Sequence, residues 1–376
     1  MPPVASKVRG WATDARARAV LGPYVVSRFA VLGALVLTRH VVTALHASPP
    51  VQTTDGLFAW DASWYRDIAL HGYGGVAKEG LRFFPLVPLL ARAGSWLPGV
   101  SVRVSLLLVA NVSALALGFL MYELARNEGR SHTVARRAVW IAYLAPPAFV
   151  LVMGYAEATL MTAALVALLA LRRRHWWIAA IAGVVAGLTR PVGLLLVVPA
   201  LVEVYLSRRE LKRAELAAGA AAIAGPVVGT GAYLAWAEHR SGDLLYPLRV
   251  QQASSRRGGW IDPVRAIWHA AHDSVSGDHL SAGIHVVTAL VLVALLVVLW
   301  RRWPASFTAY AIVAVVVALS ARNLDSLERY SLSTVPLVLA AAELVGGGTR
   351  ERVVLVLLGA TLVAFSVLAF TGVLVP

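Results

Sequence analysis

The chain has 376 residues, of which 59% are hydrophobic and only 14% are charged, and its mean hydropathy is +0.70. This balance excludes an ordinary soluble domain and is typical of polytopic membrane proteins. The sequence contains no cysteine, which excludes disulfides, thiol nucleophiles and cysteine-ligated metals.

The formal net charge of +14 would suggest a nucleic-acid partner in a soluble protein. Here the lysines and arginines gather in short joints between apolar runs, as the positive-inside rule predicts for a membrane protein. We therefore expect no nucleic-acid partner. The lipid bilayer, with its anionic headgroups, is the partner that this charge supports.

Apolar runs of roughly 15–22 residues recur along the chain and predict an all-α polytopic membrane protein with about eleven transmembrane helices. The basic segment 1–23 is expected in the cytoplasm, so the two long loops, 46–101 and 237–282, face the exoplasmic side. We expect a single transmembrane domain over residues 1–376, in the plasma membrane if the protein is bacterial. The predicted spans are 24–45, 102–122, two within 138–171, two within 176–206, then 214–236, 283–300, 304–320, 331–345 and 352–374.

Two features of these spans are expected to shape the outer face. Residues 138–171 and 176–206 are each too short for two full crossings, which need about 40 residues. Their outward turns, at Glu157 and Arg190, should therefore lie below the outer surface and open a polar cleft there. Segment 83–98 holds three prolines and an arginine, so we expect it to be re-entrant or interfacial rather than a span.

The stretch WDASWYRDIALHGY, which begins at Trp60, is the part of the chain that apolar packing cannot explain. If residues 62–71 form a helix, Asp61 is its N-cap, a position where a carboxylate is favoured. Trp60, Trp64 and Ile68 would then share one helix face that rests on the lipid headgroups. This arrangement holds Asp61 at the boundary between water and membrane, and we interpret its carboxylate as the chemical centre.

The predicted topology brings charged and ionisable residues from distant segments to the outer side: Asp61, Asp67, His71, Glu157, Arg190, Asp325, Glu328 and Arg329. A charge at the centre of a bilayer costs roughly 2.5–3.5 kcal/mol, so charges near it mark function or pair with each other. Glu157 and Arg190 also fit a buried ion pair that links two hairpins. Arg329 and Tyr330, at the start of the tenth span, also fit an ordinary anchor at the membrane interface. Arg66 and Arg82 either attract an anionic headgroup or only keep the first loop soluble.

These residues resemble the PIG-V family of integral-membrane mannosyltransferases, within the GT-C glycosyltransferase superfamily. That family carries a W-D-x-x-x-Y-x-x-I-A-x-x-G-Y segment in its first luminal or periplasmic loop, then F-F-P-x-x-P, which here is FFPLVPLL. Three later stretches are similar to family elements in the same order: GYAEATLM at 154–161, GLTRPVGLLL at 187–196 and LERYSLSTVPLVLA at 327–340. The chain departs from the family in being shorter than eukaryotic members, in Ala156 where serine is common, and in loop 237–282, which matches no family element.

The resemblance implies a GT-C-type helical bundle, with amphipathic helices in the first exoplasmic loop, and an inverting glycosyltransferase. Its donor would be a sugar, mannose by family likeness, on a polyprenyl- or dolichyl-phosphate carrier, and its acceptor a glycolipid, a glycan or a protein. Asp61 matches the family's first-loop acidic position and is assigned as general base, with a pKa that a low-dielectric surround is expected to raise. The leaving phosphate needs positive charge, and the scheme requires no metal or other cofactor. The residues expected to bind the substrate or its phosphate are His71, Arg66, Arg82, Glu157, Arg190, Arg329, Tyr330, Trp60 and Tyr65.

Two other classes of function stay open at this point. A transporter or lipid flippase would show paired, broken helices that meet at the midplane, with inverted repeats. A non-catalytic membrane scaffold subunit would leave the outer carboxylates and arginines pointing away from any common cavity. The sequence has no matching pattern between its halves, and its polar residues cluster toward one face.

Overall fold

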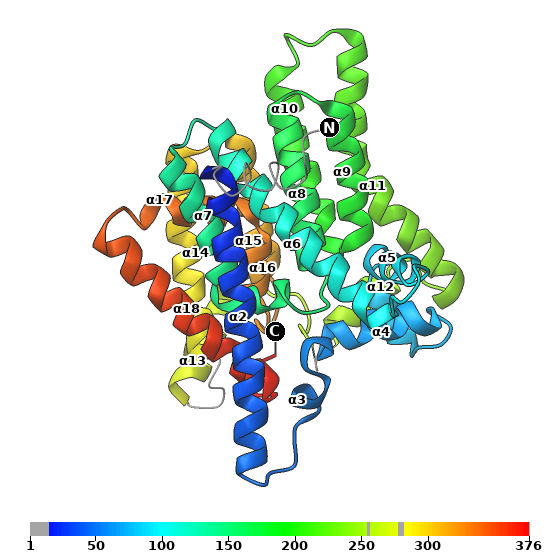
Figure 1. Ribbon diagram of the computed structural model, residues 1–376. Coiled ribbons are helices and arrows are strands. Elements are labelled where there is room, and N and C mark those ends of the chain that lie inside the picture. Colours follow the sequence, from blue (N-terminus) through cyan, green and yellow to red (C-terminus); the bar gives the residue numbers. More distant parts are fainter. Residues whose placement is uncertain (1–14, 254–255, 277–281, 376) are drawn as a thin grey trace, which may run out of the picture.

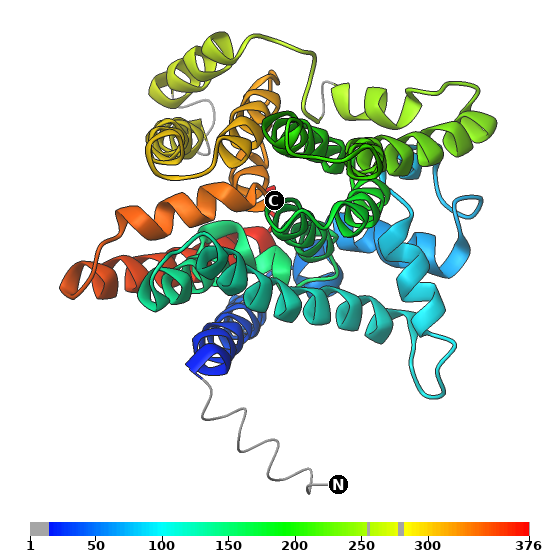
Figure 2. The same cartoon turned by 90° about the horizontal axis from the view of Figure 1, so that it is seen from above.

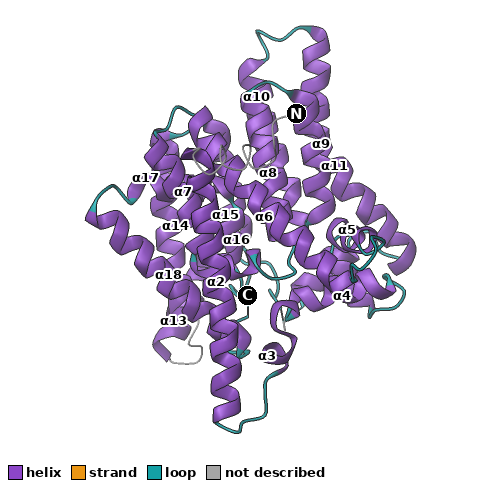
Figure 3. Ribbon diagram, in the orientation of Figure 1, coloured by secondary structure: helices purple, strands orange, loops and turns teal. Residues whose placement is uncertain are grey.

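The computed structural model describes residues 15–253, 256–276 and 282–375. Over these ranges the chain is helical, with turns and loops but no strand (Figure 3). The first fourteen residues of the expected cytoplasmic segment, and small parts of the second long loop, lie outside the described residues.

The first half of the chain contains helices of very unequal length (Figure 1). They are α2 (Ala15–Ala44), α3 (Val51–Asp55), η1 (Gly56–Phe58), α4 (Asp61–His71), η2 (Lys78–Arg82), α5 (Leu86–Gly94), α6 (Val102–Asn127), α7 (His132–Leu144), η3 (Pro146–Leu151), α8 (Glu157–Arg172) and α9 (Trp176–Thr189).

The second half repeats this mixture of long and short helices. They are η4 (Pro191–Leu196), α10 (Val197–Ser207), α11 (Arg213–Ser241), α12 (Tyr246–Arg249), η5 (Val250–Gln252), α13 (Pro263–Ser276), α14 (Ala282–Arg302), α15 (Ala305–Leu319), α16 (Leu327–Ser333), α17 (Val335–Leu344) and α18 (Thr349–Phe370).

Five helices are long and apolar enough to cross a membrane, namely α2, α6, α11, α14 and α18. Together with the shorter apolar helices between them, they support a helical, membrane-embedded protein. Each predicted span coincides with helical residues, but several expected boundaries are wrong. The first helix begins at Ala15 instead of residue 24, and the tenth predicted span divides at Thr334 into α16 and α17. Hydropathy locates only the apolar part of a helix. Polar turns that extend the helix beyond that part do not raise the hydropathy, so the sequence did not indicate them.

Segment 83–98 forms the short helix α5 and a following loop. At 1.5 Å per residue its nine residues reach only about 14 Å, less than half of a bilayer core of about 30 Å. The helix is therefore too short to cross, in agreement with the expectation that this segment is not a span. Leu89 and Trp96 are exposed, which fits contact with lipid at the interface.

Glycines let α9 approach α11 closely along their length. A Cβ on Gly187 would lie 2.6 Å from the carbonyl oxygen of Pro226, and a Cβ on Gly225 would lie 2.3 Å from that of Ala180. Such small-residue contacts are typical of helices that associate without a hydrophobic driving force. The contact fixes the end of α9, where Arg190 begins the turn into η4.

A polar cluster on α2 and α6 supports the turn that follows η3. Arg28 donates to the carbonyl oxygen of Leu151 at 2.9 Å and to Asn111 Oδ1 at 3.1 Å. The Asn111 amide donates in turn to the carbonyl oxygen of Val152 at 3.1 Å. The end of a helix leaves carbonyl groups without partners, and these side chains satisfy two of them. The supported turn leads directly to Glu157, the first residue of α8.

Candidate functional site

Asp61 is the first residue of α4, and its backbone is set by an unusual residue before it. The N-cap is Trp60, whose backbone φ of 60° lies in a region that residues other than glycine rarely adopt. The expectation that Asp61 is itself the N-cap is therefore wrong by one residue. The carboxylate still lies in the first turn of a helix, where the helix dipole favours negative charge.

The aromatic residues around Asp61 pack on protein rather than on lipid. The Trp60 indole N–H donates to the carbonyl oxygen of Ala369 in α18 at 2.9 Å. Trp64 stacks on Phe83 with ring centroids 5.5 Å apart, and Ile68 is buried. The expected lipid-facing stripe of α4 is thus wrong, because the F-F-P segment and α18 cover it.

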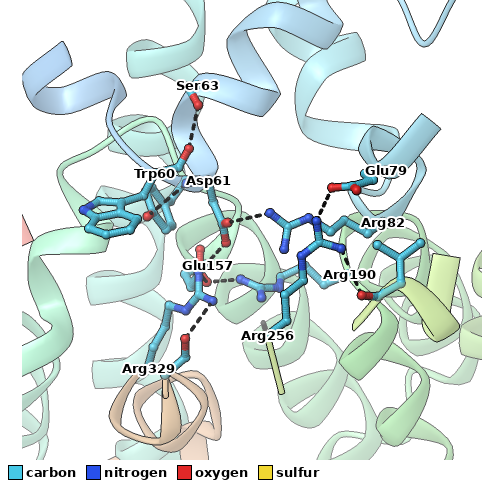
Figure 4. Close-up of polar contacts among 12 residues, drawn as sticks. Trp60, Asp61, Ser63, Glu79, Arg82, Glu157, Arg190, Arg256 and Arg329 are labelled. Atoms are coloured by element: carbon cyan, nitrogen blue, oxygen red, sulfur yellow. Dashed lines mark hydrogen bonds and ion pairs between the residues drawn. The ribbon is translucent and has the colours of Figure 1, made fainter. Parts of the chain in front are cut away.

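Five charged side chains from five segments form one ion-pair network (Figure 4). Arg329 Nη1 lies 2.6 Å from Asp61 Oδ2 and 3.2 Å from Glu157 Oε1. Arg190 pairs with the same Glu157 oxygen. Arg82 approaches the other carboxylate oxygen of Asp61, Oδ1, at 3.8 Å. The predicted pair of Glu157 with Arg190 is therefore present, and the structure joins it to Asp61 through Arg329.

Burial alone would raise the pKa of the Asp61 carboxyl. The guanidiniums of Arg329, Arg82 and Arg190 outweigh this effect and hold the pKa below its usual value of 3.8. The prediction of a raised pKa is therefore wrong, because it counted desolvation without the cations that share the site. At neutral pH Asp61 is a carboxylate. Tyr65 behaves in the opposite way: burial raises the pKa of its phenol to about 12, so it stays protonated.

A cavity of about 720 Å³ opens beside the Asp61 carboxylate. Its charged lining comes from both halves of the chain and has more cations than anions: Asp55, Asp61, Arg82, Arg190, Arg249, Arg256, Arg257, Asp325 and Arg329. Its apolar lining includes Val192, Leu194, Leu195, Leu245, Leu248 and Val317. The cavity thus offers a cationic wall and an apolar wall to the same occupant.

Two arginines of this wall have little compensation from the carboxylates that the structure describes. Within the described residues, Arg257 has no carboxylate within ion-pair distance, and its guanidinium donates to the carbonyl oxygens of Val317 and Ala318. Among the carboxylates that the structure describes, only that of Asp61 lies within ion-pair distance of Arg82, at 3.8 Å. The guanidiniums of Arg190 and Arg257 also lie over the Tyr330 ring, 5.7 Å and 4.9 Å from its centroid.

The structure brings most of the predicted site residues to this cavity. Trp60, Tyr65, Arg82, Arg190, Arg329 and Tyr330 line it, and Glu157 lies behind them, fully buried. His71 is exposed at the far end of α4 and does not line the cavity. Arg66 does not line it either, since it pairs with Asp67 at 2.8 Å and with Asp55 at 3.7 Å. The structure therefore does not bring His71 and Arg66 to this cavity, and a role for them in substrate binding stays a prediction.

Sequence reasoning missed three residues that the structure places at the site. Arg256 and Arg257 come from the second long loop, and Arg256 pairs with Glu79 of the first loop. An adjacent pair of arginines before two glycines was the available signal, but nothing in the sequence connected it to Asp61. Tyr155 was also missed: its hydroxyl accepts a hydrogen bond from the Asp61 backbone N–H at 3.3 Å.

Comparison with protein-family models gives no match to this chain, and a search of curated proteins gives no match either.

Proposed function

We propose that the protein is an inverting glycosyltransferase that takes a sugar from a polyprenyl-phosphate carrier, with Asp61 as general base. The observation that carries the proposal is the Asp61 carboxylate at the wall of a large cavity that has both a cationic and an apolar side. Mannose as the sugar and the GT-C-type bundle are parts of the proposal that rest on the sequence resemblance. The eleven spans and the exoplasmic site rest on the apolar runs and on the distribution of basic residues. The acceptor is a glycolipid, a glycan or a protein.

In the proposed reaction the acceptor hydroxyl approaches Asp61 Oδ1, since Oδ2 is occupied by Arg329. Asp61 takes the hydroxyl proton while the oxygen attacks the anomeric carbon from the face opposite the phosphate. The bond between that carbon and the phosphate oxygen breaks, and its electron pair leaves with the phosphate. The products are an inverted glycoside, a polyprenyl phosphate monoester and a protonated Asp61.

The spare charge on the cavity wall suits this leaving group. The carrier phosphate bears one negative charge as a diester and gains a second as it leaves as a monoester. Arg82 and Arg257 are the cations with the weakest compensation by carboxylates, so they are the natural ligands for that added charge. The apolar wall around Leu194 and Leu195 would receive the first part of the prenyl chain.

A lowered pKa makes Asp61 a weak base in the empty site. Binding of an anionic phosphate beside Arg82 would offset part of the positive field and raise the pKa of the carboxyl. The donor would thereby prepare the base that the acceptor needs. This coupling favours transfer to a bound acceptor only when the donor is already in place.

The alternatives differ in what they would do with the same cavity. A transporter or flippase would move the lipid-linked sugar without making a new glycosidic bond. A scaffold would need no common cavity for its outer charges, whereas Asp61, Arg190 and Arg329 face one. A transfer assay separates the glycosyltransferase from both alternatives.

The test is a transfer assay with purified protein in lipid nanodiscs. Labelled polyprenyl-phosphate-mannose is incubated with the protein and a membrane extract, and the labelled product is identified. Asp61→Asn keeps the size of the side chain and removes the base, so we expect transfer to fall by about 10²–10⁴-fold. Asp67→Asn is the matched control on the same helix, and its activity should stay close to that of the unsubstituted protein. Full activity in Asp61→Asn would remove this mechanism, and labelling of no acceptor with any prenyl-linked sugar would favour the scaffold.

A further inference from the structure

Helix α13, in the second long loop, carries an apolar stripe that faces away from the protein. Val264, Trp268 and Val275 are 77%, 71% and 90% exposed. On the opposite side of the same helix, Ala266 and Ala270 are buried, and α13 contacts α14 and α15. The helix is therefore anchored by one face while a second apolar face has no partner among the described residues.

The exposed apolar residues form one line, and polar residues form another beside it. Val264, Trp268 and Val275, with Ala271 between them, follow the spacing that places side chains on one helix face. Arg265 and His272 are exposed on the adjacent face. A narrow apolar stripe flanked by basic and polar side chains is typical of helices that lie in the surface of a membrane.

The orientation of α13 agrees with that reading. In Figure 2, which looks down on the view of Figure 1, α14 is seen nearly end-on, and α13 is seen from the side, next to it. Since α14 is one of the helices long enough to cross a membrane, α13 packs against a candidate span with its axis inclined to that span. On α14, which contacts α13, Val287 and Leu290 are also exposed.

We propose that α13 is an interfacial helix seated on the outer lipid surface, with Trp268 toward the acyl chains and Arg265 and His272 toward anionic headgroups. The stripe is one helix wide, which is too narrow for a stable interface with a second protein copy. Trp260, just before α13, is exposed and also lines the cavity. The cavity therefore opens at the level of the headgroups, where a lipid-linked molecule enters from the side. The seating of α13 on lipid does not depend on glycosyl transfer.

Because the chain has no cysteine, a single introduced cysteine can be spin-labelled without a background. Trp268→Cys and Val264→Cys report on the stripe, and His272→Cys is the matched control on the polar face. Each labelled variant is placed in nanodiscs of phosphatidylcholine with phosphatidylglycerol. Collision of the label with oxygen, which concentrates in lipid, is compared with collision with a water-soluble nickel chelate.

We expect the labels at positions 264 and 268 to collide mainly with oxygen and the label at position 272 mainly with the nickel chelate. Equal access of the chelate to all three labels would overturn the proposal, because the stripe would then face water. Protection of positions 264 and 268 from both reagents would also overturn it, because a second copy would then cover the helix. The same pattern is expected in Asp61→Asn protein, so failure of the transfer chemistry and failure of this proposal remain distinguishable.

Discussion

Arg329 Nη1 lies 2.6 Å from Asp61 Oδ2, although the two residues are 268 positions apart in the chain. The same nitrogen lies 3.2 Å from Glu157, so one guanidinium bridges two carboxylates that belong to different helices. Arg329 is itself buried. The first long loop, α8 and α16 are thus joined at one point, and the geometry of Asp61 depends on all three.

Removal of the Arg329 charge is expected to destabilise the fold strongly. Arg329→Leu removes the cation that Asp61 and Glu157 share. Loss of one partner of a buried ion pair lowers the free energy of unfolding by about 3–5 kcal/mol. Glu157→Gln in the same background should recover part of the loss. Thermal unfolding of the detergent-solubilised protein measures both effects. Arg174→Leu, which breaks an exposed pair with Glu210, is the control and should change stability by less than about 1 kcal/mol. Equal melting temperatures for Arg329→Leu and Arg174→Leu would contradict the prediction.

The pH dependence of transfer follows from the lowered pKa of Asp61. A carboxyl with a lowered pKa is ionised over the neutral and mildly acidic range, and its base form and ion-pair stability are lost only as pH falls through the lowered value. We therefore expect no loss of kcat/KM through this group between about pH 7 and about pH 5.

Arg82→Gln removes one of the cations that lower this pKa, so the acid limb of the kcat/KM profile should move to higher pH. Arg92→Gln, an exposed arginine on α5, is the matched control and should leave the limb in place. A limb with a midpoint near about pH 6 that Arg82→Gln does not move would contradict the assignment of Asp61 as base.

Loss of the Arg28 side chain is expected to act on the site from a distance. Arg28→Leu leaves the carbonyl of Leu151 without its donor, and a buried unsatisfied group costs about 1–3 kcal/mol. The turn that leads to Glu157 should loosen, which lowers both the melting temperature and the transfer rate. Arg39→Leu on the same helix removes bonds to the carbonyls of α3, partly at the surface where water can replace them, and should have the smaller effect. The reverse order of the two variants would count against a supporting role for Arg28.

Trp60→Phe tests whether the indole N–H holds Asp61 in place. The substitution keeps an aromatic ring and the unusual backbone angle but loses the bond to the carbonyl of Ala369, worth about 1 kcal/mol. Because Asp61 is the next residue, a less firmly held Trp60 should misplace the base. We therefore expect a larger fold-change in kcat than in KM. Trp96→Phe, at an exposed position, is the control. Unchanged kcat in Trp60→Phe, with normal folding, would assign the indole to packing alone.

The sequence predicted the helical class and the general position of each apolar segment because hydropathy responds directly to the membrane environment. One of the alternatives that it left open, a buried ion pair of Glu157 with Arg190, is present in the structure. It did not predict the pKa direction of Asp61, which depends on how closely Arg329 approaches from a segment far along the chain.

Other differences arose from local geometry. His71 and Arg66 belong to the same helix as Asp61, but one lies at its exposed end and the other is held by two aspartates. Arg257 reaches the cavity only because its loop folds back to the end of α15, where its guanidinium finds two carbonyl groups. Hydrophobic periodicity in a sequence does not indicate that a loop folds back onto the end of a helix.

Fully buried Glu157 has a consequence for biosynthesis. Both of its cations, Arg190 and Arg329, are translated after it, and the second follows only when most of the chain has left the ribosome. An unaccompanied carboxylate is costly in lipid, so the nascent α8 is expected to settle to its final depth only late in synthesis. A chain truncated before Arg329 should therefore be a preferred substrate for membrane proteases.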